Sequence, residues 1–236
     1  MRATELGIGV YSLAEAARLI HAERRSLDRW MFGYDYRRKG QDGDSHQCHS
    51  DPLWQSQHEQ PIAGEKVIGF RDLLELRIVR EFVSHGVSLL VVRRCLEVAR
   101  SIYNIGEFPL STRRFCTDGK TIFQEVVREG TEPEILDLRS RQYVIRDIIK
   151  PSLYSGIEYD GELARRWFPN GNKRDVVIDP DLQFGKPVLH DSGVPTAAIY
   201  AAYLAEERDA VQVARMYEIP KRMVDVAVKF EERLAA

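Results

Sequence analysis

Hydrophobic side chains recur at helical spacing in two short runs near the start of the chain. Ser12 and Glu15 are spaced as a capping box at the start of the first run, which extends to about residue 20. After a break at residues 21–23, the pattern resumes over 24–32. Two helices of roughly eight residues with a short break between them are typical of a helix-turn-helix. The apolar sides of these helices consist of Leu13, Ala16, Ala17, Ile20, Leu27, Trp30 and Met31.

Residues 33–64 have no helical period and are rich in Gly, Asp, Ser, Gln and Pro. We expect a long hairpin here, the wing, with a mobile tip and with Leu53 and Trp54 as its anchors. A second helical pair follows. Its first helix is expected to end at His85-Gly86 and its second to begin at Ser88. Their apolar faces consist of Phe70, Leu73, Leu76, Val79, Phe82, Val91, Val92, Cys95, Leu96, Ala99 and Ile102.

The middle of the chain, about 106–172, predicts strands. The run RRFCTDGKTIF has two β-prone segments on either side of Asp118-Gly119, a dipeptide typical of tight hairpins. The runs QYVIRDII, GIEYD and DVVIDP are further candidate strands. Residues 169–172 form a turn-prone cluster that we interpret as a hinge.

The last part, about 173–236, predicts a C-terminal unit of three helices with a small β element. Strands are expected at 176–178 and 188–189, on either side of a turn at 184–187. The helices are expected to begin at Thr196, after the cap Asp209 and at Pro220, and the last two are again at helix-turn-helix spacing. The sequence therefore predicts a mainly α, α+β protein with a head (1–105), a β-rich connecting region (106–172) and the helical C-terminal unit (173–236).

Composition and charge narrow the function classes. The chain has 236 residues, a formal net charge of −2 and three cysteines, which excludes a histone-like polycation and a disulfide framework. It has no apolar run of membrane-spanning length, and its first residues do not resemble a signal peptide. We therefore expect a cytoplasmic protein without a membrane partner.

Charge is concentrated locally in the head. Residues 18–39 contain seven basic residues against three acidic ones, which indicates an anionic partner, although a solvated helix face would have the same composition. Arginine can pair with guanine edges or grip phosphates, so we expect the second helix to enter the major groove of DNA. The candidate DNA contacts are Arg24, Arg25, Ser26, Arg29, Arg37, Arg38 and Lys39.

Other chemistry finds little support in the residues. His46, Cys48 and His49, with His58, form the spacing H-x-C-H, which matches no known zinc pattern, so we expect no metal and no cofactor. Cys116 is expected in a strand, and it and Cys95 are interpreted as core residues. No phosphate loop, nucleophile elbow or metalloprotease motif is present in the sequence, so we expect no enzymatic activity.

The C-terminal unit contains more large apolar side chains than so small a core can hide. Exposed apolar surface usually marks an interface, although an internal core is the alternative. The candidate partner contacts are Tyr200, Tyr203, Arg215, Met216, Lys221 and Arg222.

Two segments resemble known families. The order YSLAEAARLI, HAERRSLDRW, wing and FRDLLELRIV…HGVS…VRRCL resembles the MerR-type winged helix-turn-helix. The segment VVIDPDLQFGKPVL…TAAIYAAYLAEERDAVQVARMYEIPKRMVDVAVKF is similar to a small uncharacterised domain of bacterial antitoxins. Together, in this order, they resemble the long MerR-headed antitoxins of VapB type.

The resemblance implies an antitoxin that neutralises a PIN-domain ribonuclease toxin and represses its own operon as a homodimer on operator DNA. A stand-alone MerR-like regulator with a sensing or protein-binding C-terminal region is the alternative. A structural adaptor remains a third possibility if the basic helix is only solvated.

Overall fold

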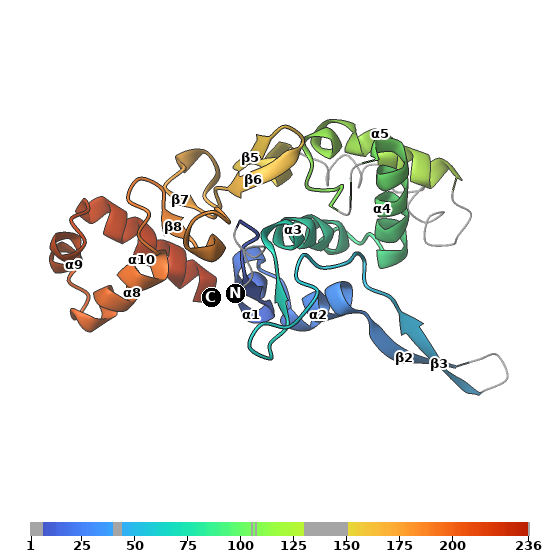
Figure 1. Ribbon diagram of the computed structural model, residues 1–236, viewed down its shortest axis with the longest axis horizontal. Helices are drawn as coiled ribbons and strands as arrows, with labels where there is room; N and C mark the ends of the chain where they lie inside the picture. The colour runs from blue at the N-terminus through green and yellow to red at the C-terminus, as the bar shows by residue number, and fades with distance from the viewer. Residues whose placement is uncertain (1–6, 40–43, 105, 107, 130–150, 236) are drawn as a thin grey trace.

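The computed structural model describes residues 7–39, 44–104, 106, 108–129 and 151–235 (Figure 1). About half of these residues are helical, and the strands form small antiparallel sheets, as expected of an α+β protein. The helices are α1 (Leu13–Ile20), α2 (Arg24–Phe32), α3 (Phe70–Ser84), α4 (Leu89–Tyr103), α5 (Arg113–Glu129), α8 (Thr196–Ala205), α9 (Ala210–Met216) and α10 (Lys221–Ala235). The strands are β1 (Tyr11–Ser12), β2 (Tyr34–Lys39), β3 (Ser45–Ser50), β4 (Val67–Ile68), β5 (Ile157–Asp160), β6 (Leu163–Trp167), β7 (Val176–Val177) and β8 (Val188–Leu189).

Each strand pairs with one partner, in four two-stranded antiparallel sheets across the described residues: β1 with β4, β2 with β3, β5 with β6, and β7 with β8. In Figure 1 the molecule is elongated, with α8, α9 and α10 at one end, the β2–β3 hairpin projecting at the other, and β5–β6 between α5 and β7–β8. In the described part of the chain, no helix combines the length and the hydrophobicity needed to cross a bilayer.

The predicted first helix pair is confirmed. Ser12 caps α1, because its hydroxyl accepts from the Glu15 N–H at 3.2 Å while the Glu15 carboxylate accepts from the Ser12 N–H at 2.9 Å. His21 ends α1 in the left-handed conformation, and α2 begins three residues later. The predicted apolar sides of both helices are buried, with Leu27 and Met31 almost inaccessible to solvent.

The wing and the second helix pair also form as predicted, except that Ile102, expected on the apolar face of α4, is 48% exposed. β2 and β3 pair from Tyr34 opposite Ser50 to Lys39 opposite Ser45. Leu53 and Trp54 lie in the chain that returns from the hairpin, and both are buried. The expected mobile tip falls on residues 40–43, which lie outside the described residues.

A buried carboxylate fixes that returning chain to α3. Asp72 accepts hydrogen bonds from Trp54 Nε1 at 2.8 Å, the Ser56 hydroxyl at 2.9 Å and the Gln57 N–H at 3.0 Å. It also accepts from the Gly69 N–H at 2.9 Å at the start of α3. Burial raises the pKa of Asp72, and these four donors oppose the rise. The wing is thus attached to a rigid helix rather than to a free loop.

The prediction of a hairpin around Asp118-Gly119 is wrong, because this segment is the helix α5. The Thr112 hydroxyl accepts from the Phe115 N–H at 3.1 Å at the start of the helix, and Phe115 and Phe123 are fully buried on its inner side. Cys116 accordingly lies in a helix, half-buried, and not in a strand. Packing against α4 along a helical period outweighs the local β preference of the run.

The remainder of the predicted β-rich region is mixed. GIEYD and DVVIDP contribute β5 and β7, which confirms two of the candidate strands, whereas QYVIRDII lies outside the described residues. The predicted hinge at 169–172 runs into a short 3-10 helix, η3 (Gly171–Lys173). Trp167 and Ile178 exchange two backbone hydrogen bonds, of 2.9 and 2.8 Å, and so join β6 to the β7 segment.

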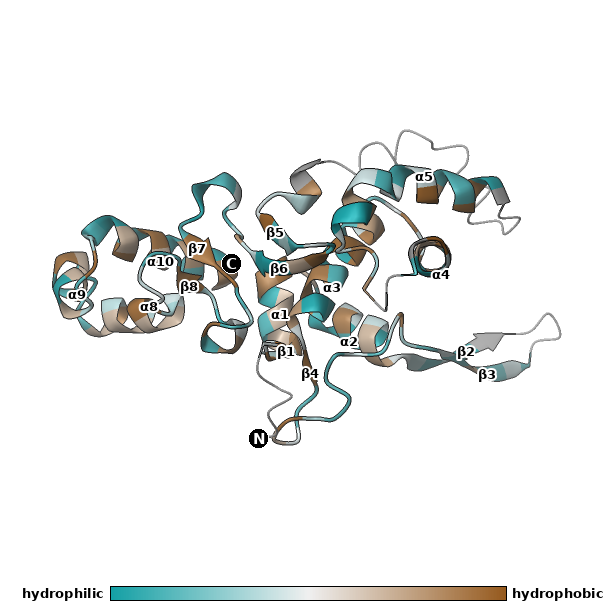
Figure 2. Cartoon of the chain, turned by 45° about the horizontal axis from the view of Figure 1, so that its top comes forward, coloured by the Kyte–Doolittle hydropathy of each residue, from teal (hydrophilic) through white to brown (hydrophobic). Residues whose placement is uncertain are grey.

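The C-terminal unit has its three predicted helices. Asp209 caps α9 by accepting from the N–H groups of Val211 and Gln212 at 2.8 and 3.0 Å. Figure 2 shows α8 pale to brown along most of its length, as its sequence TAAIYAAYLA implies, and β7 and β8 brown where they enter the core. α10 packs on both α8 and α9 and also contacts α1 of the head.

Contacts between residues far apart in the sequence attach this unit to the head. The Val10 N–H donates to the Phe184 carbonyl at 2.9 Å, and Lys186 forms an ion pair with Glu15. Burial raises the pKa of Glu15, but hydrogen bonds from Lys186 and Ser12 outweigh burial, so this pKa ends below its usual range. The turn at 184–187 therefore lies directly against the start of α1.

Candidate nucleic-acid interface

The predicted DNA contacts on α2 lie on its solvent side. Arg24, Arg25 and Arg29 are exposed and Ser26 is half-buried, while the opposite side of the helix is in the core. Arg25 and Arg29 are four residues apart, so they share one face of the helix. α2 begins at Arg24, and its N-cap residue Glu23 makes no side-chain hydrogen bond to the first turn.

The hairpin extends this basic surface. Arg37 is exposed on β2, and Arg38 and Lys39 continue the strand in register with His46 and Ser45, although their side chains lie outside the described part of the structure. The Arg29 guanidinium lies 4.5 Å from the centre of the Tyr34 ring, a cation–π contact that connects α2 to the base of the hairpin. This contact thus connects one helix candidate, Arg29, to the strand that contains the hairpin candidates.

A hollow of about 760 Å³ lies between the starts of α1 and α2. Arg24 and Arg25 line it, and so does Lys66, a residue that the sequence analysis did not select. Lys66 Nζ lies 2.8 Å from Asp28 Oδ1 and 4.6 Å from the centre of the Phe32 ring, so it is fixed beside α2. Lys66 belongs to a loop without periodicity, so no pattern in the sequence identifies it.

Arg93 of α4 is a second residue that the sequence did not reveal. Its guanidinium donates to the Pro52 carbonyl at 3.0 Å and the Ser50 hydroxyl at 3.2 Å, and it also donates to the Asp51 carbonyl. These acceptors lie where the chain leaves β3. Arg93 therefore sets the direction in which the hairpin projects from the head.

The candidate metal residues do not converge. Cys48 and His49 are neighbours in β3, and successive strand residues point to opposite faces. The His49 Nδ1 is 2.7 Å from Asp35 Oδ1 across the hairpin, and the His58 ring contacts the Gly9 carbonyl at 2.8 Å elsewhere in the head. Among the described residues, no three His, Cys, Asp or Glu side chains are grouped as a metal site would require.

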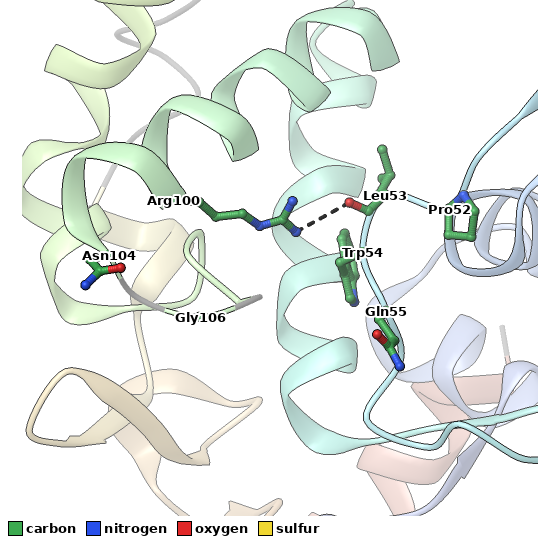
Figure 3. Close-up of a pocket in the computed structure, with 7 residues that line it drawn as sticks. All are labelled: Pro52, Leu53, Trp54, Gln55, Arg100, Asn104 and Gly106. Atoms are coloured by element: carbon green, nitrogen blue, oxygen red, sulfur yellow. Dashed lines mark hydrogen bonds between the residues drawn. The ribbon is translucent and has the colours of Figure 1, made fainter.

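Figure 3 shows a separate pocket of about 690 Å³ between the loop after the hairpin and the end of α4. The Arg100 guanidinium reaches across it to the Leu53 carbonyl at 3.5 Å. The Trp54 indole N–H, the other strong donor at this point, is directed at Asp72. Through these hydrogen bonds, the chain that returns from the hairpin is attached to α3 and α4. The pocket therefore lies among the contacts that hold the hairpin in place.

The predicted partner contacts are distributed over three helices. Tyr200 and Tyr203 of α8 are half-buried, whereas Arg215 and Met216 of α9 and Lys221 and Arg222 of α10 are exposed. Met216 has 53% of its surface exposed, and Leu204 and Val211 have 48% and 45%. The predicted exposed apolar surface is present, but it belongs more to α9 and the end of α8 than to the tyrosines.

No family model matches the chain. It is 27% identical over 201 residues to a Mycobacterium tuberculosis protein named "Putative antitoxin VapB45", a match that covers 81% of each chain. The crystal structure of Rv2018 from Mycobacterium tuberculosis superposes with a TM-score of 0.68 at 24% sequence identity, covering 92% of this chain and 96% of that one. The helix pair, hairpin and helical C-terminal unit described above therefore form the fold that Rv2018 has.

Proposed function

We propose that this protein is an antitoxin whose head binds operator DNA as a homodimer and represses its own operon, and whose C-terminal unit neutralises a PIN-domain ribonuclease toxin. The proposed DNA binding rests on one observation. Arg24, Arg25 and Arg29 lie on the exposed side of α2, and Arg29 connects this helix to a projecting hairpin. The similarity to the protein named "Putative antitoxin VapB45" supports the antitoxin role. The proposal requires no catalysis.

In this proposal α2 enters the major groove, which admits one helix. Arg25 and Arg29 pair with guanine edges or phosphates, and Ser26 contacts the base or backbone beside them. Arg37, Arg38 and Lys39 hold the phosphates next to the groove. Two heads related by a twofold axis read the two halves of a palindromic site.

The DNA half is tested by titrating the DNA upstream of the protein's own gene at several salt concentrations. For the wild-type protein, the logarithm of the affinity should fall linearly with the logarithm of the salt concentration. Arg25→Glu/Arg29→Glu should weaken binding about a hundredfold. The control is Arg165→Glu/Arg208→Glu, an equal change of charge at two exposed residues away from α2, and it should bind as the wild type does. Equal affinities for all three proteins would refute DNA reading by α2.

The proposed toxin neutralisation is tested by co-expression with a candidate toxin, a PIN-domain ribonuclease from the same genome. The antitoxin should restore growth and elute with the ribonuclease as one complex in size-exclusion chromatography. Intact DNA binding with neither growth rescue nor a complex would favour a stand-alone transcriptional regulator.

A further inference from the structure

A groove of about 630 Å³ lies between η3 and one side of α10. The α10 residues that line it are three or four positions apart for the most part, so they form a stripe along the helix. Lys173 of η3 lines the opposite side. The stripe on α10 consists of Arg222, Asp225, Val226, Lys229, Phe230 and Arg233.

Both carboxylates of the groove are already engaged within the chain. Asp225 Oδ2 forms an ion pair with Lys221 Nζ at 2.9 Å. Asp175 accepts a hydrogen bond from the side-chain amide of Asn170 at 2.7 Å. The Arg233 guanidinium donates to the same amide's oxygen at 2.7 Å, which closes one end of the groove.

Among the described residues, three cations of the groove have neither an acidic partner nor an amide acceptor such as the one that Arg233 has. Lys173, Arg222 and Lys229 are exposed, and none forms an ion pair with an acidic side chain in the ranges that the structure describes. They come from two elements and flank one hollow. An anionic ligand in the groove would therefore meet cations that other carboxylates do not neutralise.

The residues at the bottom of the groove favour one kind of anionic ligand over another. Val226 is half-buried, and Phe230 is 2% exposed, with the Arg233 guanidinium 5.4 Å from the centre of its ring. Proteins bind single-stranded nucleic acid by stacking bases on accessible aromatic rings, and this ring is covered. The accessible apolar surface at the bottom of the groove is that of Val226, with cations around it, so the groove instead suits a polypeptide in which carboxylates and aliphatic side chains alternate.

We infer that the groove between η3 and α10 docks an acidic, partly apolar segment of a partner protein. Resting on the function proposed above, the segment belongs to the toxin. Lys173, Arg222 and Lys229 form ion pairs with its carboxylates, and its apolar side chains lie on Val226. Of the six partner contacts predicted from the sequence, Arg222 alone lines this groove.

The test compares Arg222→Glu/Lys229→Glu with the control Lys120→Glu/Arg165→Glu in the full-length chain, whose two exposed residues lie outside the C-terminal unit. Three labelled probes are titrated by fluorescence anisotropy: a short peptide of alternating Glu and Leu, an oligothymidine, and a purified candidate PIN-domain ribonuclease from the same genome. The groove variant should bind the peptide and the ribonuclease about tenfold more weakly than the wild type, and the control should not differ. Arg222→Gln/Lys229→Gln should give an intermediate loss, which separates charge from folding.

The outcomes distinguish the two proposals. If the groove variant binds both peptide and ribonuclease as tightly as the wild type does, the groove is not the docking site, while toxin binding and the proposed function stand. Loss of peptide binding in the variant, with no ribonuclease binding by the wild type, supports the groove and refutes the toxin as its occupant. A loss confined to the oligothymidine, or an equal loss in groove variant and control, also overturns the proposal.

Discussion

The hydroxyl of Tyr11 donates a hydrogen bond of 2.8 Å to the carbonyl of Gly185, although the two residues are 174 positions apart. Tyr11 is 2% exposed, and burial raises its pKa well above the usual range, so the hydroxyl keeps its proton at all physiological pH values. Gly185 has φ +83° and passes so close to the ring that an added Cβ would lie 2.2 Å from the hydroxyl oxygen. This contact closes the junction between the head and the C-terminal unit.

Gly185→Ala should destabilise the protein by about 3 kcal/mol, since it combines a left-handed backbone with a clash against a buried ring. Gly193→Ala is the matched control, because Gly193 has φ +68° but nothing within 4 Å of an added Cβ. The control should cost about 1 kcal/mol from the backbone alone. Denaturant unfolding measures both values, and equal losses would show that the contact with Tyr11 is unimportant.

Tyr11→Phe should lower the free energy of unfolding by about 1–2 kcal/mol, because the buried Gly185 carbonyl loses its donor. The ring remains, so the packing of the head should not change. A double-mutant cycle with Lys186→Met, which removes the neighbouring ion pair with Glu15, would measure how far the two contacts cooperate. A stability equal to that of the wild type would contradict the role assigned to this hydrogen bond.

Glu75 should make the stability of the protein depend on pH. Burial raises the pKa of this carboxyl to about 8, although the N–H groups of Leu110 and Ser111 donate to it at 3.2 and 2.7 Å. Because the carboxyl binds its proton more tightly in the folded state than in the unfolded state, protonation of Glu75 stabilises the fold. This contribution to the free energy of unfolding is complete below about pH 4.5 and is lost as the pH rises through about 8.

Glu75→Gln removes that titration. The stability of this variant relative to the wild type should therefore be higher at pH 9 than at pH 5, as thermal unfolding at the two values would show. Glu97→Gln, at an exposed position of α4, is the control for the loss of a surface carboxylate, and the difference between the two pH values is compared with it. A Glu75→Gln profile parallel to that of the wild type would contradict the raised pKa.

Arg93→Met should weaken DNA binding several-fold with little change in the unfolding temperature, because it frees the base of the hairpin without opening the core. Arg94→Met is the control, since Arg94 is the next residue and pairs with exposed Glu97 at 2.9 Å. Both variants are titrated with the upstream DNA. Equal effects of the two substitutions would show that Arg93 contributes only charge.

The sequence predicts the head well because its signals are local. The capping box at Ser12, the helical period of α2 and the cap at Ser88 each involve residues within one or two turns. The prediction failed at α5, where the dipeptide at Gly119 outweighed a longer pattern: Phe115, Ile122, Phe123, Val126 and Val127 recur at helical spacing and are buried. Gly119 lies inside this helix, where an added Cβ would come within 2.7 Å of the Phe115 ring.

The candidate site could be predicted only in part for the same reason. The arginines of α2 stand out by local charge, whereas Lys66 and Arg93 act through partners that are 38 and 41 residues away. The groove on α10 requires Lys173, which precedes Arg222 by many positions and joins it only in the folded chain. Contacts of this kind depend on tertiary structure and leave no period in the sequence.

The divided role of Glu15 has a consequence for the order in which the protein assembles on the ribosome. One oxygen of its carboxylate accepts from Ser12, three residues earlier, while the other accepts from Lys186, which is translated 171 residues later. The cap of α1 therefore uses only residues that leave the ribosome together, while the helix itself depends on later packing because eight residues alone form a marginal helix. The ion pair at Lys186 can close only when the C-terminal unit has left the exit tunnel, so this junction is available to the chain later than the cap.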